Sequence, residues 1–270
     1  LRAAPLCGIG GPGGAAVRAR PVVLDASPRP GTADVGPTVF AQAFDDPGFR
    51  RRVAAELAPQ VQDGEAVGLP AVIGLDGAPG SWAALQEAVG APVFEIGGLP
   101  PSVPGLRMYR ALTAALREVG GRLVLGPAAV SGEAVGGRLT GVVVRQSGRR
   151  RAYPAGAVVL ATGGLAAGGI ELDSRGHLHE TVLGLPVDGP APGDPGALST
   201  AYLDPQPLMA AGLRVDPDMR PLGPGGEPVY ENLHAAGDVL AGAAPWRDGT
   251  GEGIAIASSD AAARAILGAS

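Results

Sequence analysis

The spacing of apolar residues predicts a buried helix in the first quarter of the chain. In the run TVFAQAFDDPGFRRRVAAELAP, residues 38–59, Phe49, Val53 and Leu57 recur at i, i+4 and i+8. Residues at this spacing share one face of a helix, so one helix with a single buried stripe is expected here. Pro59 is expected to end it, because proline cannot continue the helical hydrogen bonding.

Two further helices are predicted downstream. SWAALQEAVG, residues 81–90, has Ser81 as its expected N-cap and Gly90 as its terminator. LRMYRALTAALREVGG, residues 106–121, predicts an amphipathic helix ended by two glycines. Its apolar side comprises Leu106, Leu112, Leu116 and Val119.

Apolar runs between glycines predict the strands. A strand is expected at 21–25, a strand entering a loop at 66–77, and a strand followed by a proline-rich corner at 91–105. Short strands joined by glycine turns are expected over 122–146. The remaining predicted segments are a buried strand in 155–165, strands and long loops over 166–230, a strand and turn at 231–242, and a closing helix within 249–267.

This order of elements is typical of an α/β protein with a Rossmann-like nucleotide-binding core. We expect part of such a core in residues 105–166 and its C-terminal segment in 231–270. Residues 1–104 then form a cap on the substrate side, and 167–230 supply return strands and loops. The fold class expected is therefore α/β, with a partial nucleotide-binding core and an inserted α+β cap region.

Composition narrows the possible functions. A net charge of −5 gives no basic field for nucleic acid, and no apolar run approaches the length of a membrane span. The single cysteine, Cys7, excludes an internal disulfide framework and a cysteine-ligated iron–sulfur centre. We therefore expect a cytoplasmic protein that meets a membrane only indirectly.

The run CGIGGPGGAAV contains a G-x-G-x-x-G pattern at Gly8, Gly10 and Gly13. A dinucleotide loop needs a preceding strand and a following helix, with a ribose-binding acid about 20 residues on. Here too few residues separate the loop from the strand predicted at 21–25, and Asp25 follows Gly13 by only 12. An ordinary turn is favoured over a degenerate nucleotide loop, and an NAD-binding domain built on these glycines is the least favoured function.

The motif near the C-terminus carries more chemistry. In NLHAAGDV, a half-apolar strand ends at Gly237 and Asp238. Glycine lets a ligand approach the backbone, and the carboxylate can accept hydrogen bonds from ribityl or sugar hydroxyls. A helix with a small-residue first turn follows, and its N–H groups favour the partial negative charge of a flavin edge or a phosphate. The residues concerned are Gly249, Thr250, Gly251, Glu252 and Gly253.

The run VVLATGG supplies a second motif. Thr162 is expected to satisfy backbone groups freed at the end of the strand, and Gly163 and Gly164 allow a tight exit. Taken alone, this run also fits a buried strand that ends in a turn. The two motifs in this order, after a helix and hairpin, favour a flavin site.

These segments together resemble the B subunit of anaerobic glycerol-3-phosphate dehydrogenase. The more particular matches are the LPPSVPGLR corner and the VLAGAAPWRDGTGEG run, and the similarity extends from Gly98 to the C-terminus, with a looser match before it. The resemblance implies an FAD/NAD(P)-binding fold and FMN as cofactor, with FAD as the alternative. It also implies oxidation of glycerol 3-phosphate, a phosphorylated polyol, to dihydroxyacetone phosphate, with electrons passing to quinone.

The same resemblance implies partners: the catalytic, FAD-bearing A subunit of such a complex, and its iron–sulfur C subunit, which anchors the complex at the inner face of the cell membrane. Members of the family open with a strand and a glycine-rich flavin loop that this sequence does not show. We therefore expect the chain to correspond to the C-terminal two-thirds of the family. The alternative function is a cofactor-free docking module of a flavoprotein complex.

Residues that act on the substrate are not identified by any motif. Arg247 and Asp248, just before the glycine-rich helix, and Arg107, in the proline-rich corner, are the candidates. The planar fork of arginine suits phosphate. An ordinary surface ion pair is the alternative for each of them.

The histidines give no metal site. His177 and His179 lie at strand spacing and share one side, but zinc needs more ligands than two. A surface pair is expected there. His234 alternates with Leu233 in the last predicted strand, which favours a core or subsurface position.

Overall fold

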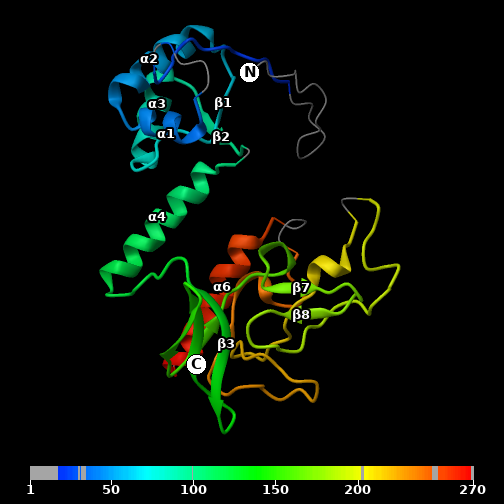
Figure 1. Ribbon diagram of the computed structural model, residues 1–270. Coiled ribbons are helices and arrows are strands. Elements are labelled where there is room, and N and C mark those ends of the chain that lie inside the picture. The colour runs from blue at the N-terminus through cyan, green and yellow to red at the C-terminus, as the bar shows by residue number, and fades with distance from the viewer. Residues whose placement is uncertain are drawn as a thin grey trace. The chain divides into compact units, whose positions relative to one another are not determined.

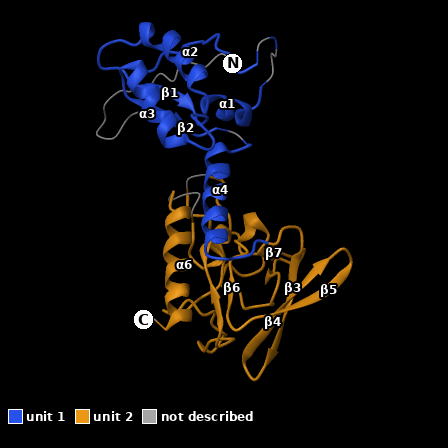
Figure 2. Cartoon of the chain, turned by 90° about the vertical axis from the view of Figure 1, so that its left-hand side faces the viewer, with its two compact units in different colours: residues 1–123 blue, residues 124–270 orange. Residues whose placement is uncertain are grey.

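The computed structural model describes residues 18–29, 31, 35–98, 100–201, 204–244 and 249–268. The chain divides into two compact units, residues 1–123 and residues 124–270, called unit 1 and unit 2 below (Figure 2). The glycine pattern at Gly8, Gly10 and Gly13 lies outside the described residues. The helix that we assigned to the start of the nucleotide-binding core groups with unit 1, and our four-part division of the chain stays a prediction.

Unit 1 contains a β-α-β unit with helices around it (Figure 1). Its two strands pair in parallel, with Val67 opposite Val93 and Pro70 opposite Ile96, and the connecting helix makes the crossover that parallel pairing requires. Its elements are α1 (Pro37–Phe44), α2 (Pro47–Leu57), the 3-10 turn η1 (Ala58–Gln60), β1 (Val67–Pro70), α3 (Ala78–Val89), β2 (Val93–Ile96) and α4 (Val103–Glu118).

The helix predicted over 38–59 is two helices, α1 and α2. The chain breaks at Asp46, whose carboxylate accepts the N–H groups of Gly48 and Phe49 at 3.1 and 3.0 Å. Pro47 then takes the first helical position, where its missing N–H is not needed. The buried stripe is confirmed, because Phe49 and Val53 are both at most 2% exposed.

The predictions for α3 and for residues 21–25 need correction. The helix α3 begins at Ala78, so Ser81 lies inside it and is not its N-cap. The Ser81 side chain is buried and accepts a hydrogen bond from Arg50. Gly90 does end the helix, with φ of 75°. Residues 21–25 form no strand in the structure.

The apolar side of α4 is not a buried stripe. Leu112, Leu116 and Val119 are 64%, 39% and 82% exposed, and only Val103 and Thr113 of this helix are buried. Ser102 caps the helix by accepting the Gly105 N–H at 3.1 Å, which sets its start three residues before the predicted one. Amphipathic spacing therefore predicted the helix correctly, but it did not predict that most of its apolar side is exposed.

Unit 2 combines an antiparallel meander with a parallel pair of strands. The three meander strands follow one another by tight glycine turns and form a twisted ribbon (Figure 2). The strands are β3 (Ala128–Val135), β4 (Arg138–Gln146), β5 (Arg149–Pro154), β6 (Val158–Leu160), β7 (Ile170–Leu172), β8 (Leu178–Glu180) and β9 (Leu233–Ala235). The helix α6 (Gly251–Leu267) closes the chain, and 3-10 turns occur at η2 (Leu165–Ala167), η3 (Pro207–Ala210) and η4 (Gly237–Val239).

The strands β6 and β9 are far apart in sequence but pair in parallel, with Val158 opposite Leu233 and Leu160 opposite Ala235. Strand β9 is completely buried. The described part of the long segment between these strands holds the hairpin β7–β8, the turns η2 and η3, and long loops, in agreement with the strands and long loops predicted over 166–230. The strands predicted over 122–146 are confirmed as β3 and β4, the third meander strand β5 was not predicted, and the predicted final strand is confirmed as β9.

The side-chain amide of Asn232 joins the meander to the parallel pair. Its Oδ1 accepts the Leu139 N–H, and its Nδ2 donates to the carbonyl oxygens of Leu139 and Gly156, each at 2.8 Å. Asn232 is 5% exposed, and its own carbonyl oxygen accepts the Val158 N–H at 2.9 Å. Buried polar groups without partners are costly, so these bonds fix the position of β9 against β4 and β6.

We expect Asn232→Ala to lower the free energy of unfolding of unit 2 by about 3 kcal/mol, because it leaves backbone groups of Leu139 and Gly156 without partners. Denaturant unfolding followed by circular dichroism measures this. The neighbouring variant Glu231→Ala is the control: it breaks only an exposed ion pair with Arg138, and we expect a loss below about 1 kcal/mol. Equal losses for the two variants would contradict the role given to the amide.

Candidate functional site

The predicted flavin motifs lie side by side at the carboxyl end of the β6–β9 pair. Because the strands are parallel, Thr162–Gly164 after β6 and Gly237–Asp238 after β9 leave the same edge. Ligands of α/β folds bind at such edges. The contact is close: a Cβ on Gly164 would lie 2.8 Å from the Asp238 carbonyl oxygen and 3.2 Å from its Oδ2. Only glycine allows this approach.

Two glycines of these loops adopt a left-handed backbone. Gly163 has φ of 76° and Gly237 has φ of 79°, a region that L side chains rarely adopt. A Cβ built on Gly237 would meet no atom of the described residues within 4 Å, so the backbone there has room beside it among these residues. The turn after β9 is therefore tight, and its outer side is accessible to a ligand.

The carboxylate of Asp238 is held in this turn. Burial raises the pKa of Asp238 above its ordinary value, and a hydrogen bond from the Gly164 N–H acts in the opposite direction. In the described part of unit 2, Gly164 is the backbone donor that lowers this pKa. The carboxylate thus keeps acceptor capacity for another donor.

The helix α6 starts without a side-chain cap. Thr250 occupies the N-cap position, and its side chain makes no capping hydrogen bond. The first N–H groups of a helix have no partner within it, so this end attracts negative charge. Gly249 and Gly253 have open space where a Cβ would be, and Gly251 and Glu252 complete the first turn.

Ser258, a residue that the sequence analysis did not single out, connects this helix to the turn after β9. Its hydroxyl accepts the Gly237 N–H at 2.9 Å and donates to the Ile254 carbonyl oxygen at 2.6 Å. The only sequence signal is a serine in a helix of small residues, which has no specific meaning by itself.

The role expected of Thr162 is wrong. Its Oγ1 is buried and has no hydrogen-bond partner among the described residues, so it satisfies no freed backbone group there. The hydroxyl instead packs against Gly169, where a Cβ would lie 2.7 Å from Oγ1. The turn is closed by backbone bonds, including one from the Gly169 N–H to the Gly164 carbonyl oxygen at 3.2 Å.

The candidates for contact with substrate are only partly described. Arg247 and Asp248 lie outside the described residues. Arg107 lies in unit 1, where Nη1 and Nη2 bond both carboxylate oxygens of Glu95 at 2.7 and 2.9 Å and Nε donates to the Gly74 carbonyl oxygen. The alternative was an ion pair at the surface, whereas this pair is partly buried. A phosphate role for Arg107 stays a prediction.

The histidines occupy the expected kinds of position. His177 and His179 are exposed and lie 3.4 and 3.2 Å from the same carboxylate oxygen of Asp173. No group of three or more metal-binding side chains suited to an ion occurs in the described residues. His234 is 5% exposed, and its Nδ1 lies 2.7 Å from the Asp218 carbonyl oxygen, so Nδ1 carries the proton.

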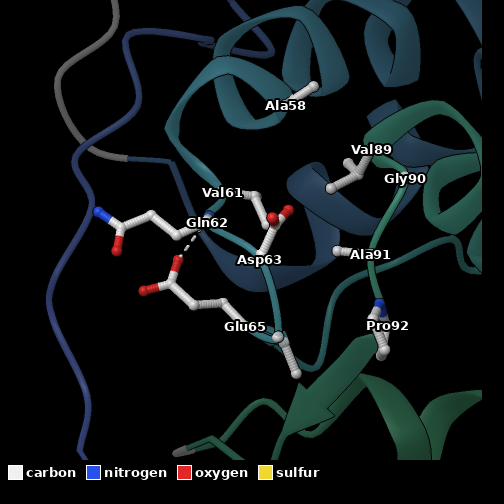
Figure 3. A pocket seen from close by; sticks show the side chains of 11 residues that line it. Ala58, Val61, Gln62, Asp63, Glu65, Val89, Gly90, Ala91 and Pro92 are labelled. Carbon is white, nitrogen blue, oxygen red and sulfur yellow. Dashed lines mark hydrogen bonds between the residues drawn. The ribbon is translucent and has the colours of Figure 1, made fainter.

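Two hollows of unit 1 contain none of the predicted flavin residues. One, of about 300 Å³, lies between the end of η1 and the end of α3, with the Asp63 carboxylate pointing toward Val89 (Figure 3). The other, of about 200 Å³, is lined by Trp82, Glu95 and Arg107 together with Ile73, Ala78 and Pro79. The glycine-lined edge of unit 2 remains the better candidate site, because it brings together the predicted flavin glycines, the Asp238 carboxylate and the start of α6.

Comparison with known proteins identifies the family of the chain. The model of the FAD binding domain family matches residues 17–254. A protein from Halobacterium salinarum, described as the probable B subunit of anaerobic glycerol-3-phosphate dehydrogenase, is 34% identical over 235 residues, covering 87% of this chain and 54% of the relative. The corresponding B subunit from Yersinia enterocolitica is 34% identical over 231 residues, 85% of this chain and 53% of the relative. No solved structure matches.

The chain thus spans about half the length of the curated relatives it matches. The family match confirms the expected FAD/NAD(P)-binding fold, and the mixed α/β units agree with it. The resemblance to the B subunit is confirmed as well. None of the helices in the described residues is long and apolar enough to cross a membrane.

The raised pKa of Asp238 predicts a pH-dependent effect on stability. The native state binds this proton more tightly than the unfolded chain, so Asp238 destabilises the protein increasingly as pH rises above its ordinary value of 3.8. Without flavin, we expect Asp238→Asn to be more stable than wild type at pH 7. The difference should disappear as the pH falls below that value. Chemical unfolding at several pH values measures it.

Asp173→Asn is the matched comparison, for which we expect the opposite change in stability. The His177 N–H, with further donors, lowers the pKa of Asp173 to about 2, so its ionised form stabilises the fold and that contribution is lost as pH falls toward 2. This variant should be less stable than wild type at pH 7. Shifts of the same sign in both variants would contradict the assignment for Asp238.

Proposed function

The chain belongs to the FAD binding domain family, and from this premise we propose that unit 2 carries the flavin site of a B subunit of anaerobic glycerol-3-phosphate dehydrogenase. The single observation that carries the proposal is the direct packing of Gly164 against Asp238, beside an uncapped helix start. The cofactor of this family is a flavin. When bound, a flavin accepts a hydride equivalent from a substrate and passes its electrons on.

The residues at this edge fit such a group. Gly237 leaves room for close approach to the backbone, and Asp238 keeps acceptor capacity for a ribityl or sugar hydroxyl. The first N–H groups of α6 can stabilise partial negative charge, either on a phosphate or on the ring edge of a reduced flavin. Gly249 and Gly253 leave that helix end unobstructed. The chain thus binds and orients the cofactor chiefly through backbone groups.

The finer assignments belong to this proposal. We assign FMN, which the resemblance implies, with FAD as the alternative. The reaction assigned is oxidation of glycerol 3-phosphate to dihydroxyacetone phosphate, with electrons passing to quinone. The partners are the FAD-bearing A subunit of the complex and its iron–sulfur C subunit, which holds the complex at the inner face of the membrane. Arg247, Asp248 and Arg107 are the candidates for contact with the substrate.

Titration of the purified chain with FMN and with FAD tests the flavin site. We expect quenching of flavin fluorescence and a rise in melting temperature with ligand concentration, because a ligand that binds only the native state stabilises it. FMN should bind more tightly than FAD. Absence of both responses for both flavins would contradict the proposal and favour the alternative, a cofactor-free docking module of a flavoprotein complex.

Gly253→Ala separates flavin binding from stability. Gly253 is the third residue of α6 and has open space around its Cβ position, so alanine should raise the free energy of unfolding by roughly 0.5–1 kcal/mol. The added methyl group stands at the helix end assigned to the flavin, and we expect weaker flavin binding. The variant should therefore gain stability and lose affinity, as measured by unfolding and by fluorescence titration.

Gly80→Ala is the matched control, because Gly80 is also the third residue of a helix, α3, and is also open at its Cβ position. It should gain similar stability and keep the wild-type flavin affinity. If both variants bind flavin as wild type does, the start of α6 does not face the cofactor.

A further inference from the structure

The hydroxyl group of Ser258 links two elements of the site by accepting one hydrogen bond and donating another. It accepts a hydrogen bond from the Gly237 N–H at 2.9 Å and donates its own hydrogen to the Ile254 carbonyl oxygen at 2.6 Å. Ser258 is 7% exposed and lies in the first half of α6. A hydroxyl that donates inside its own helix presents its lone pairs outward, so its acceptor side is fixed in direction.

This link acts where the chain turns after β9. Gly237 has φ of 79°, and the residue that follows it is Asp238. The Ala236 N–H bonds to the Leu160 carbonyl oxygen at 3.0 Å, which holds the chain on the strand side. On the helix side, the Ser258 hydroxyl accepts the N–H of the next residue, Gly237. The turn is thus fastened to β6 at one residue and to α6 at the next.

We propose that Ser258 is a positioning residue for flavin binding, which holds the Gly237–Asp238 turn against α6 so that the Asp238 carboxylate and the helix start face one ligand together. This inference rests on the proposed flavin site. Ser258 itself is buried and needs no contact with the flavin. Ser258 affects flavin binding through the position that it gives to the Asp238 carboxylate.

The neighbouring Ser259 gives a matched control within the same helix. Ser259 is exposed, whereas Ser258 is buried. Both residues have the same helix propensity, so alanine at either position changes the intrinsic stability of the helix equally. Any difference in flavin binding between the two variants therefore reflects the contacts of the hydroxyl group.

The test is a double-mutant cycle on the whole chain, with FMN and FAD titrated by fluorescence quenching well below the melting temperature of every variant. We expect Ser258→Ala to weaken flavin binding about 10-fold, the effect of one lost hydrogen bond, and Ser259→Ala to change it less than about 2-fold. Asp238→Asn weakens binding by itself. In the Asp238→Asn background, Ser258→Ala should have almost no further effect, because coupled residues are not additive.

A purely structural role would give a different pattern, with the same loss from Ser258→Ala in both backgrounds. That result, or equal binding by the Ser258→Ala and Ser259→Ala variants, would overturn the inference while leaving the flavin site intact. A wild-type chain that binds neither flavin would overturn the proposed function and this inference with it. Should Ser258→Ala not fold, Ser258→Cys takes its place in the cycle, since it keeps the volume but is a weaker hydrogen-bond partner.

Discussion

The amide of Asn232 links three parts of unit 2 that are distant in the sequence. Through three side-chain hydrogen bonds it ties the start of β9 to Leu139 of the meander and to Gly156 just before β6. The parallel register of β6 and β9 begins at the next residue pair, Val158 and Leu233. The two loops that form the site leave the far end of this short pair. A shift at the amide end would therefore move the loops relative to each other, and the contact between Gly164 and Asp238 has no room for such a shift.

The candidate site that this register creates depends mainly on glycines, which have no side chain. Gly164 touches Asp238 because it has no Cβ, and Gly237 turns the chain with a positive φ while leaving space beside it. This explains why the sequence could predict that the two glycine motifs lie side by side. Glycines after an apolar strand and a Gly-Asp pair after another are local signals, and parallel strands bring their carboxyl ends together whatever lies between them.

The residues that hold the site in place could not be predicted in the same way. Asn232 and Ser258 are single polar residues in apolar or small-residue surroundings, and their partners lie far along the chain or across an interface between elements. Periodicity carries no information about such pairs. It also failed at α4, where the spacing gave the helix but not the environment of Leu112. The break before α2 could have been predicted, because Asp46 followed by Pro47 is a local N-cap signal. The sequence analysis followed the stripe of apolar residues instead and expected one continuous helix.

Two aspartates in tight turns show how the two units use a carboxylate differently. Asp45 in unit 1 accepts the N–H groups of Leu75, Asp76 and Gly77, and although burial acts to raise its pKa, these bonds and the charge of Arg107 bring the pKa below its ordinary value. Its acceptor capacity is spent on organising a loop. For Asp238 the balance is reversed, since burial prevails over the Gly164 N–H and the pKa is raised. In its ionised form, a carboxylate in this position gains from any further donor. Among the described residues, Asp238 has fewer hydrogen-bond donors than Asp45, and this difference therefore favours a hydroxyl-bearing ligand at the Asp238 turn over one at Asp45.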